Sequence, residues 1–159
     1  MFNLFEKLEP IHFKKLLVIS WMLWWVIAFL TDVFGGLKHI GLLNYGWAFD
    51  GNYPFLQQSL AMYHVPNWMC AFLFIGIILW SLLSAKMFIY ACCSLNQPDN
   101  VWKRRASWAF IISLLFWFAF FLGDQITMKF DLEENHMVQA GMEFLSYLSL
   151  FLLPDVIAK

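Results

Sequence analysis

The chain has 159 residues, of which 62% are hydrophobic and 20% aromatic, and its mean hydropathy is +0.65. Only 13% of the residues are charged and the formal net charge is −1, whereas soluble domains carry about 25% charged residues. This balance excludes an ordinary soluble domain and predicts a protein whose solvent is lipid.

The N-terminal segment places Phe2, Phe5 and Leu8 on one stripe of a helix and its charged residues elsewhere. A helix with one apolar and one polar face rests in the headgroup region, so residues 2–10 are expected to lie on lipid or on a partner subunit. Residues 16–34 form the first apolar run, and a spanning helix needs about 20 such residues. The run is too long for a cleaved signal peptide and no small-residue cleavage site follows it, so we expect a retained span.

Residues 53–63 form a second amphipathic segment, in which Leu56 and Leu60 share one side of a helix. We expect another short interfacial helix here. The second and third apolar runs follow at about 68–93 and 106–123. Neither run alternates with a period of two, and an open sheet cannot satisfy its backbone in lipid, so both are predicted to be helices.

The last apolar run, residues 138–154, is the shortest and the least apolar. The preceding residues, 124–137, carry four carboxylates and His136, and we expect them to form an outer loop. Residues 1–159 are therefore predicted to form a single all-α domain, a polytopic membrane protein with four transmembrane helices in a bundle and short interfacial helices.

Lysine and arginine lie mainly before the first span and between the second and third. These residues are Lys7, Lys14, Lys15, Lys103, Arg104 and Arg105. Basic residues in short loops stay on the cytoplasmic side, so both termini are predicted to be cytoplasmic (N-in/C-in). We expect an integral protein of the bacterial inner (cytoplasmic) membrane, in contact with membrane lipids.

Three histidines and several carboxylates fall on the predicted outer side, and Glu143 lies more than one turn inside the last apolar run. At about 100° per residue, His136 and Glu143 share one helix face. An unpaired carboxylate in lipid is costly, so this face should be turned to protein, with Glu143 hydrogen-bonded to His136 or to Trp, Tyr and Ser side chains of neighbouring spans.

Imidazole and carboxylate groups suit zinc, copper or iron, which makes an outer metal or proton-handling site one hypothesis. Its candidate residues are His39, His64, Asp124, His136 and Glu143. No two of them follow a recognised ligand spacing, and hydrogen bonding between helices is the more ordinary explanation. Catalytic residues stay unassigned.

No specific motif implies a cofactor. The histidines lie at span ends or in loops, which argues against haem, and the three cysteines form no C-x-x-C pair. No phosphate loop, Ser-His-Asp pattern or nucleic-acid module is present, so we expect no nucleic-acid partner. Trp21, Trp24, Trp25 and Trp117 lie deep in their spans, which suggests contact with other chains or a bound lipid, quinone or carotenoid; ordinary bundle packing is the alternative.

The third and fourth spans resemble those of a family of small bacterial integral membrane proteins with four spans. The residues that carry the resemblance are Thr31-Asp32, Trp117-Phe118, Phe121, Gly123, Gln139-Ala140, Phe144 and Leu153-Pro154-Asp155. A looser likeness is to DoxX-like four-helix proteins. The resemblance implies the fold and no known reaction.

Three functions are compatible with this sequence. We favour an accessory or scaffolding subunit of a larger membrane complex, since no catalytic motif is present and the soluble loops are short. The alternatives are a membrane enzyme or redox/metal-cofactor protein with an outer His/carboxylate site, and a homo-oligomeric channel or transporter. The expected partners are other membrane-protein subunits or further copies of the chain.

Overall fold

A computed structural model describes residues 10–44, 46 and 51–155. Within these residues the chain is helical and contains no strand, which confirms the all-α prediction. The α-helices are α1 (Pro10–His39), α2 (Asn52–Leu60), α3 (Asn67–Cys92), α4 (Asp99–Thr127) and α5 (Phe130–Leu152), and a 3-10 turn, Ala61–Tyr63, follows α2.

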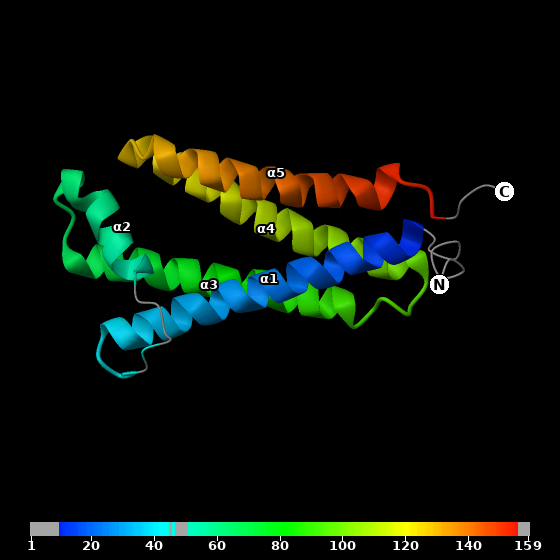
Figure 1. Ribbon diagram of the computed structural model, residues 1–159, viewed down its shortest axis with the longest axis horizontal. Coiled ribbons are helices and arrows are strands. Elements are labelled where there is room, and N and C mark those ends of the chain that lie inside the picture. The colour runs from blue at the N-terminus through cyan, green and yellow to red at the C-terminus, as the bar shows by residue number, and fades with distance from the viewer. Residues whose placement is uncertain (1–9, 45, 47–50, 156–159) are drawn as a thin grey trace.

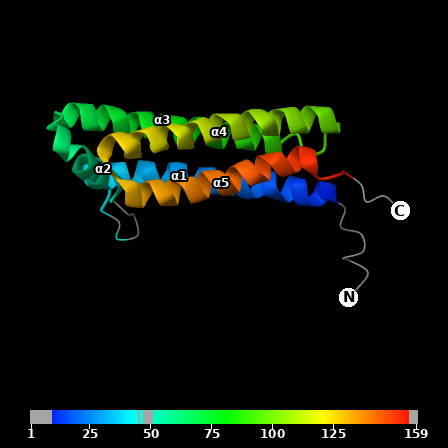
Figure 2. The same ribbon diagram turned by 90° about the horizontal axis from the view of Figure 1, so that it is seen from above.

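The four long helices run side by side, and the short helix α2 lies at one end of the bundle (Figures 1 and 2). Helix α1 packs on α3, α3 on α4 and α4 on α5, with a slighter contact between α1 and α5. Helix α1 begins and α5 ends at the same end of the bundle, beside the α3–α4 connection, whereas the α4–α5 turn lies at the α2 end (Figure 1).

Three helices, α1, α3 and α4, are long and apolar enough to cross a membrane, which fits an integral membrane protein. Many of their large apolar side chains are exposed; Leu23, Ile75 and Leu115 are each more than half exposed. Such side chains are suited to lipid, where the backbone of a helix is already hydrogen-bonded within itself.

The interior of α3 and α4 is rich in small side chains. The buried ones are Ser81, Ser84, Ala85 and Ala91 on α3, and Ala106, Ala109 and Ser113 on α4. Small residues let neighbouring helix backbones approach closely. The Trp80 indole donates a hydrogen bond of 3.0 Å to the Ile112 carbonyl, and the rings of Phe88 and Phe110 meet edge to face at 5.0 Å, so the two helices are also joined by specific contacts.

A buried lysine joins α1 to the end of α5. The Lys14 ammonium donates to the carbonyls of Leu150 (3.0 Å) and Leu153 (2.7 Å) and to the Asp155 carboxylate (2.7 Å). The last carbonyls of a helix lack intrahelical partners and carry partial negative charge, so a cation there is favourable. Lys103, on α4, pairs with the other Asp155 oxygen at 2.6 Å, and these two lysines hold the pKa of Asp155 below its usual range.

The predicted outer loop at residues 124–137 is wrong. Helix α4 continues to Thr127 and α5 begins at Phe130, so only Met128 and Lys129 form the connection. Met128 adopts a left-handed conformation (φ 55°) and the Lys129 N–H bonds the Asp124 carbonyl at 3.0 Å, which closes the helix end in a tight turn. The acidic residues that follow fall in the first turns of α5, where the helix dipole favours negative charge.

Helices α1 and α4 extend beyond the predicted spans 16–34 and 106–123, because an apolar run marks the lipid-facing part of a helix and not its polar ends, whereas α3 agrees with the predicted span of about 68–93. The basic stretch before the third span is helical, since α4 begins at Asp99 after Pro98. Residues 53–63 are helical as predicted, in α2 and the 3-10 turn, and α2 packs on α1 and α3. The predicted N-terminal interfacial helix lies outside the described residues, apart from Pro10.

Candidate functional site

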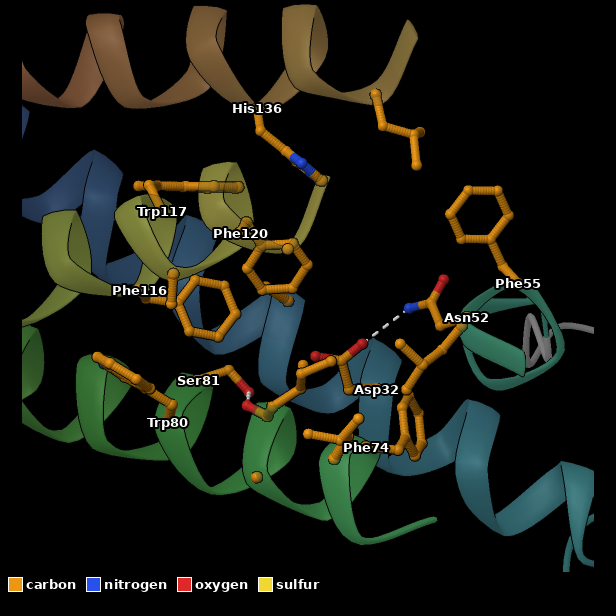
Figure 3. A pocket seen from close by; sticks show the side chains of 18 of the residues that line it. Asp32, Asn52, Phe55, Phe74, Trp80, Ser81, Phe116, Trp117, Phe120 and His136 are labelled. Carbon is orange, nitrogen blue, oxygen red and sulfur yellow. Dashed lines mark hydrogen bonds between the residues drawn. The ribbon is translucent and has the colours of Figure 1, made fainter. Parts of the chain in front are cut away.

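A cavity of about 850 Å³ lies between the long helices at the α2 end of the bundle. All five α-helices contribute to its lining, and Figure 3 shows side chains converging on it from several of them. Ligand sites in proteins occupy about 300–1,000 Å³ and combine a mainly apolar wall with a few polar groups. The size of this cavity is therefore that of a small-molecule site.

Aromatic side chains form much of the wall. Phe116 contacts Trp25 at 5.2 Å, Trp80 at 5.8 Å and Phe120 at 4.7 Å between ring centroids. Trp117 continues the cluster beside Trp25 at 5.8 Å. Edge-to-face and tilted ring pairs of this kind restrict one another, so the apolar wall is held in shape by its own packing.

The lid over the cavity is α2, which is tied to three other helices. Asn52, at its start, donates a hydrogen bond of 2.7 Å to Asp32 on α1 (Figure 3). The Tyr53 ring packs edge to face on Phe74 of α3 at 5.3 Å, and the Tyr63 hydroxyl, in the following 3-10 turn, donates to a carbonyl of α4. These anchors turn Asn52 and Ser59, seven residues apart on one helix face, toward the cavity.

A second carboxylate in the lining is paired with a histidine. Asp124 on α4 is buried, and its Oδ2 lies 2.5 Å from Nδ1 of His136 on α5. A carboxylate accepts hydrogen bonds, so it places the imidazole proton on Nδ1 and leaves Nε2 of the neutral ring as an acceptor. The ring itself packs on Phe120 at 4.8 Å and Trp117 at 5.8 Å (Figure 3).

Glu143 lies two turns further along α5 and is fully buried. Its Oε1 accepts hydrogen bonds from the Trp25 indole at 3.1 Å and the Ser113 hydroxyl at 2.5 Å, and its Oε2 accepts one from the Trp117 indole at 2.7 Å. One carboxyl group therefore joins α1, α4 and α5. Because both indoles also line the cavity, Glu143 fixes the orientation of part of its wall.

The structure brings only part of the predicted site together. Asp124 and His136 form a pair, and Glu143 faces protein as predicted, with the expected Trp and Ser donors. His136 was also an expected donor to Glu143, and it bonds Asp124 instead. His39 is exposed beside the Tyr53 ring, and His64 is exposed with φ 50°, so neither lines the cavity.

Among residues 10–44, 46 and 51–155, no three His, Cys, Asp or Glu side chains are placed to hold a metal ion. The polar groups that sequence reasoning missed are Asn52 and Ser59. The sequence indicates these two residues only by their spacing. Asn52 and Ser59 are seven residues apart with Leu56 between them, so all three lie on one face of α2. Asp32, which was not among the candidate site residues, gains its place in the site from its hydrogen bond with Asn52.

Comparison with protein families, with characterised proteins and with solved structures finds no match to this chain. The resemblance to small four-span membrane proteins therefore stays a prediction.

Proposed function

We propose that this protein is a non-enzymatic integral membrane protein that binds a mainly apolar small molecule in the cavity beneath α2. The observation that carries the proposal is the cavity itself: about 850 Å³, walled by Trp and Phe side chains, with polar groups only at Asp32, Asn52, the Asp124–His136 pair and a few neutral side chains. Three of the four deep tryptophans that suggested a partner chain or a bound molecule, Trp24, Trp25 and Trp117, line this space, which favours the bound molecule.

The proposal includes α5 as a fourth span. Its 23 residues reach about 35 Å, enough for about 30 Å of hydrocarbon. Its carboxylate Glu143 is buried, while Met142, Leu145 and Phe151 are exposed. With four spans, the start of α1 and the end of α5 share one side, and the basic first turns of α1 and α4 make that side cytoplasmic. We propose the bacterial inner membrane as the membrane in which it lies.

Cysteine labelling tests this topology. Cys93 is exposed at the proposed cytoplasmic end, and Glu134→Cys in a Cys93→Ser background reports on the other end. An impermeant thiol reagent should label position 134 in intact cells and Cys93 only after permeabilisation. A C-terminal epitope that is accessible in intact cells would overturn the fourth span.

Two matched glycine substitutions test ligand binding. Gly123 lines the cavity and Gly141 does not, and a Cβ added at either residue meets no atom within 4 Å. Both leucine variants gain helix propensity of about 0.5–1 kcal/mol. We expect wild type and Gly141→Leu to retain an apolar molecule through purification in mild detergent, and Gly123→Leu to lose it with an unchanged circular dichroism spectrum. Equal retention by both variants, or a wild-type protein without any bound molecule, would refute the proposal.

A second candidate function, the accessory subunit, is favoured by an apolar face on α4. Its exposed side chains are Trp108, Ile111, Leu115, Phe118 and Leu122. This stripe runs along the helix at spacings of three and four and offers lipid or a partner helix a continuous surface. Subunits that co-purify in mild detergent would support this role, and a clean monomer would count against it. A channel or an enzyme stays an alternative without a specific supporting observation.

A further inference from the structure

Four polar residues of the lining, Asp32, Asn52, Asp124 and His136, offer hydrogen-bond acceptors to a bound molecule, while Gln139 and the Trp24 indole add neutral donors. Asp32 and Asp124 are carboxyl groups, and Nδ1 of His136 lies against Asp124, so that Nε2 is an acceptor whenever the ring is neutral. Asn52 donates from its amide nitrogen to Asp32, which leaves its amide oxygen as a further acceptor. A bound molecule would meet these acceptors best with hydroxyl, amide or ammonium donors.

Ser59 is the second observation that points to a ligand. Its hydroxyl is buried in the lining, and no described group hydrogen-bonds it. A buried hydroxyl without a hydrogen-bond partner is unfavourable, so such groups in native proteins call for a partner. A hydroxyl or amine on a bound molecule would supply it, since a serine both accepts and donates.

The charge of the lining excludes one class of head group. Two carboxyl groups line the cavity, and no lysine or arginine of the described chain does. His136 is the one lining residue that can become a cation, and Asp124 already offsets that charge. A buried anion needs a compensating cation or several strong donors, so a carboxylate, phosphate or sulfate head would be bound poorly here.

We propose that the cavity binds an amphiphile whose apolar chain packs on the aromatic wall and whose head donates hydrogen bonds and carries no negative charge. This rests on the proposed function, that the cavity binds a mainly apolar molecule. Long-chain alcohols, amides and amines have this chemistry, and fatty acids and phosphate-bearing lipids do not.

Three probes with one chain separate the head groups: hexadecanol, hexadecylammonium and hexadecyl sulfate. The full-length protein in mild detergent is titrated with each, and the bound fraction is counted by native mass spectrometry. The common chain keeps the apolar contribution constant. We expect the alcohol and the ammonium ion to bind at least about tenfold more tightly than the sulfate, which is a difference of about 1.4 kcal/mol.

Two variants and a control assign the selectivity to residues. Asp32→Asn should reduce the preference for hexadecylammonium over hexadecyl sulfate by about tenfold. Glu134→Gln is the control: it removes the same charge from an exposed side chain of α5 and should leave this preference unchanged. Ser59→Ala removes a hydroxyl that no described group hydrogen-bonds, so the fold should survive. The affinity for hexadecanol should fall about threefold to tenfold.

The outcomes separate this inference from the function on which it rests. If none of the three probes binds, the proposed ligand-binding function fails. If hexadecyl sulfate binds as tightly as the other two, the cavity binds amphiphiles but the head-group assignment is wrong. An unchanged affinity of Ser59→Ala for hexadecanol would remove Ser59 from the site and overturn the assignment as well.

Discussion

Replacing Glu143 tests whether one buried carboxyl group holds three helices together. Glu143→Ala removes the carboxyl group that accepts hydrogen bonds from Trp25, Trp117 and Ser113, and Glu143 is fully buried. The Ser113 hydroxyl also lies 2.9 Å from the carbonyl of Ala109 and can donate there instead. An indole N–H only donates and has no such alternative, so the substitution leaves two buried donors unpaired.

The expected magnitude follows from that count. A buried donor left without a partner costs about 1–3 kcal/mol, although hydrogen bonds between membrane helices average only about 0.6 kcal/mol. We therefore expect Glu143→Ala to lower the free energy of unfolding by about 2–4 kcal/mol. Glu143→Gln keeps one acceptor oxygen and turns its amide nitrogen toward an indole, so it should cost about 1–2 kcal/mol.

Unfolding by SDS in mixed micelles, followed by far-ultraviolet circular dichroism, measures the loss. Glu134→Ala is the matched control, because Glu134 is an exposed residue of α5, and this substitution should change the free energy of unfolding by less than about 0.5 kcal/mol. In a double-mutant cycle, Trp117→Phe should cost less in the Glu143→Ala background than in wild type. A Glu143→Ala protein as stable as Glu134→Ala would refute the reasoning.

Other predictions concern the lysine clamp, in which Lys14 and Lys103 pair with Asp155, and the buried serines Ser84 and Ser113. Lys103 and Lys14 lower the folded-state pKa of Asp155, so this carboxylate stabilises the fold above the ordinary carboxyl pKa, and the stabilisation is lost as pH falls through the lowered pKa. The unfolding curves of wild type and Asp155→Asn should therefore converge in acid. A difference in stability between the two proteins that does not change with pH would contradict this prediction. Lys14→Met leaves three acceptors without their cation and should lower the free energy of unfolding by about 1–3 kcal/mol in the same SDS assay. Ser84→Ala removes a buried hydroxyl that has no partner among the described residues, and it should raise the free energy of unfolding by about 0.5–1 kcal/mol. Ser113→Ala removes a donor to Glu143 and should lower the free energy of unfolding by about 1 kcal/mol; the opposite order would show that the two hydroxyls are not distinguished by their partners.

If the glycine and amphiphile experiments succeed, the protein's function is defined by what occupies the cavity. The lid, α2, then has a role in ligand entry, because it is held in place by side-chain contacts to α1, α3 and α4. Its anchors, Asn52 and Tyr63, are the places at which entry of a ligand would be controlled.

Much of the architecture is determined by composition and by runs of apolar residues. A backbone in lipid must satisfy its own hydrogen bonds, so long apolar runs become helices whatever their neighbours do. For the same reason Glu143 had to face protein, and a neighbourhood rich in Trp and Ser made those residues its expected donors. The helix ends were less predictable, since the turn at Met128 depends on a local left-handed conformation and not on hydropathy.

The site required tertiary structure. Asp32 meets Asn52 across 20 residues, Asp124 meets His136 across 12, and Lys14 reaches Asp155 across 141. A helical period shows which residues share a face of one helix, but the rotation and offset of that helix against its neighbours are set by side-chain packing along the whole contact. The sequence by itself therefore determined a bundle of apolar helices with a buried carboxylate. The cavity, its lid and the lysine clamp were decided only when packing fixed how those helices face one another.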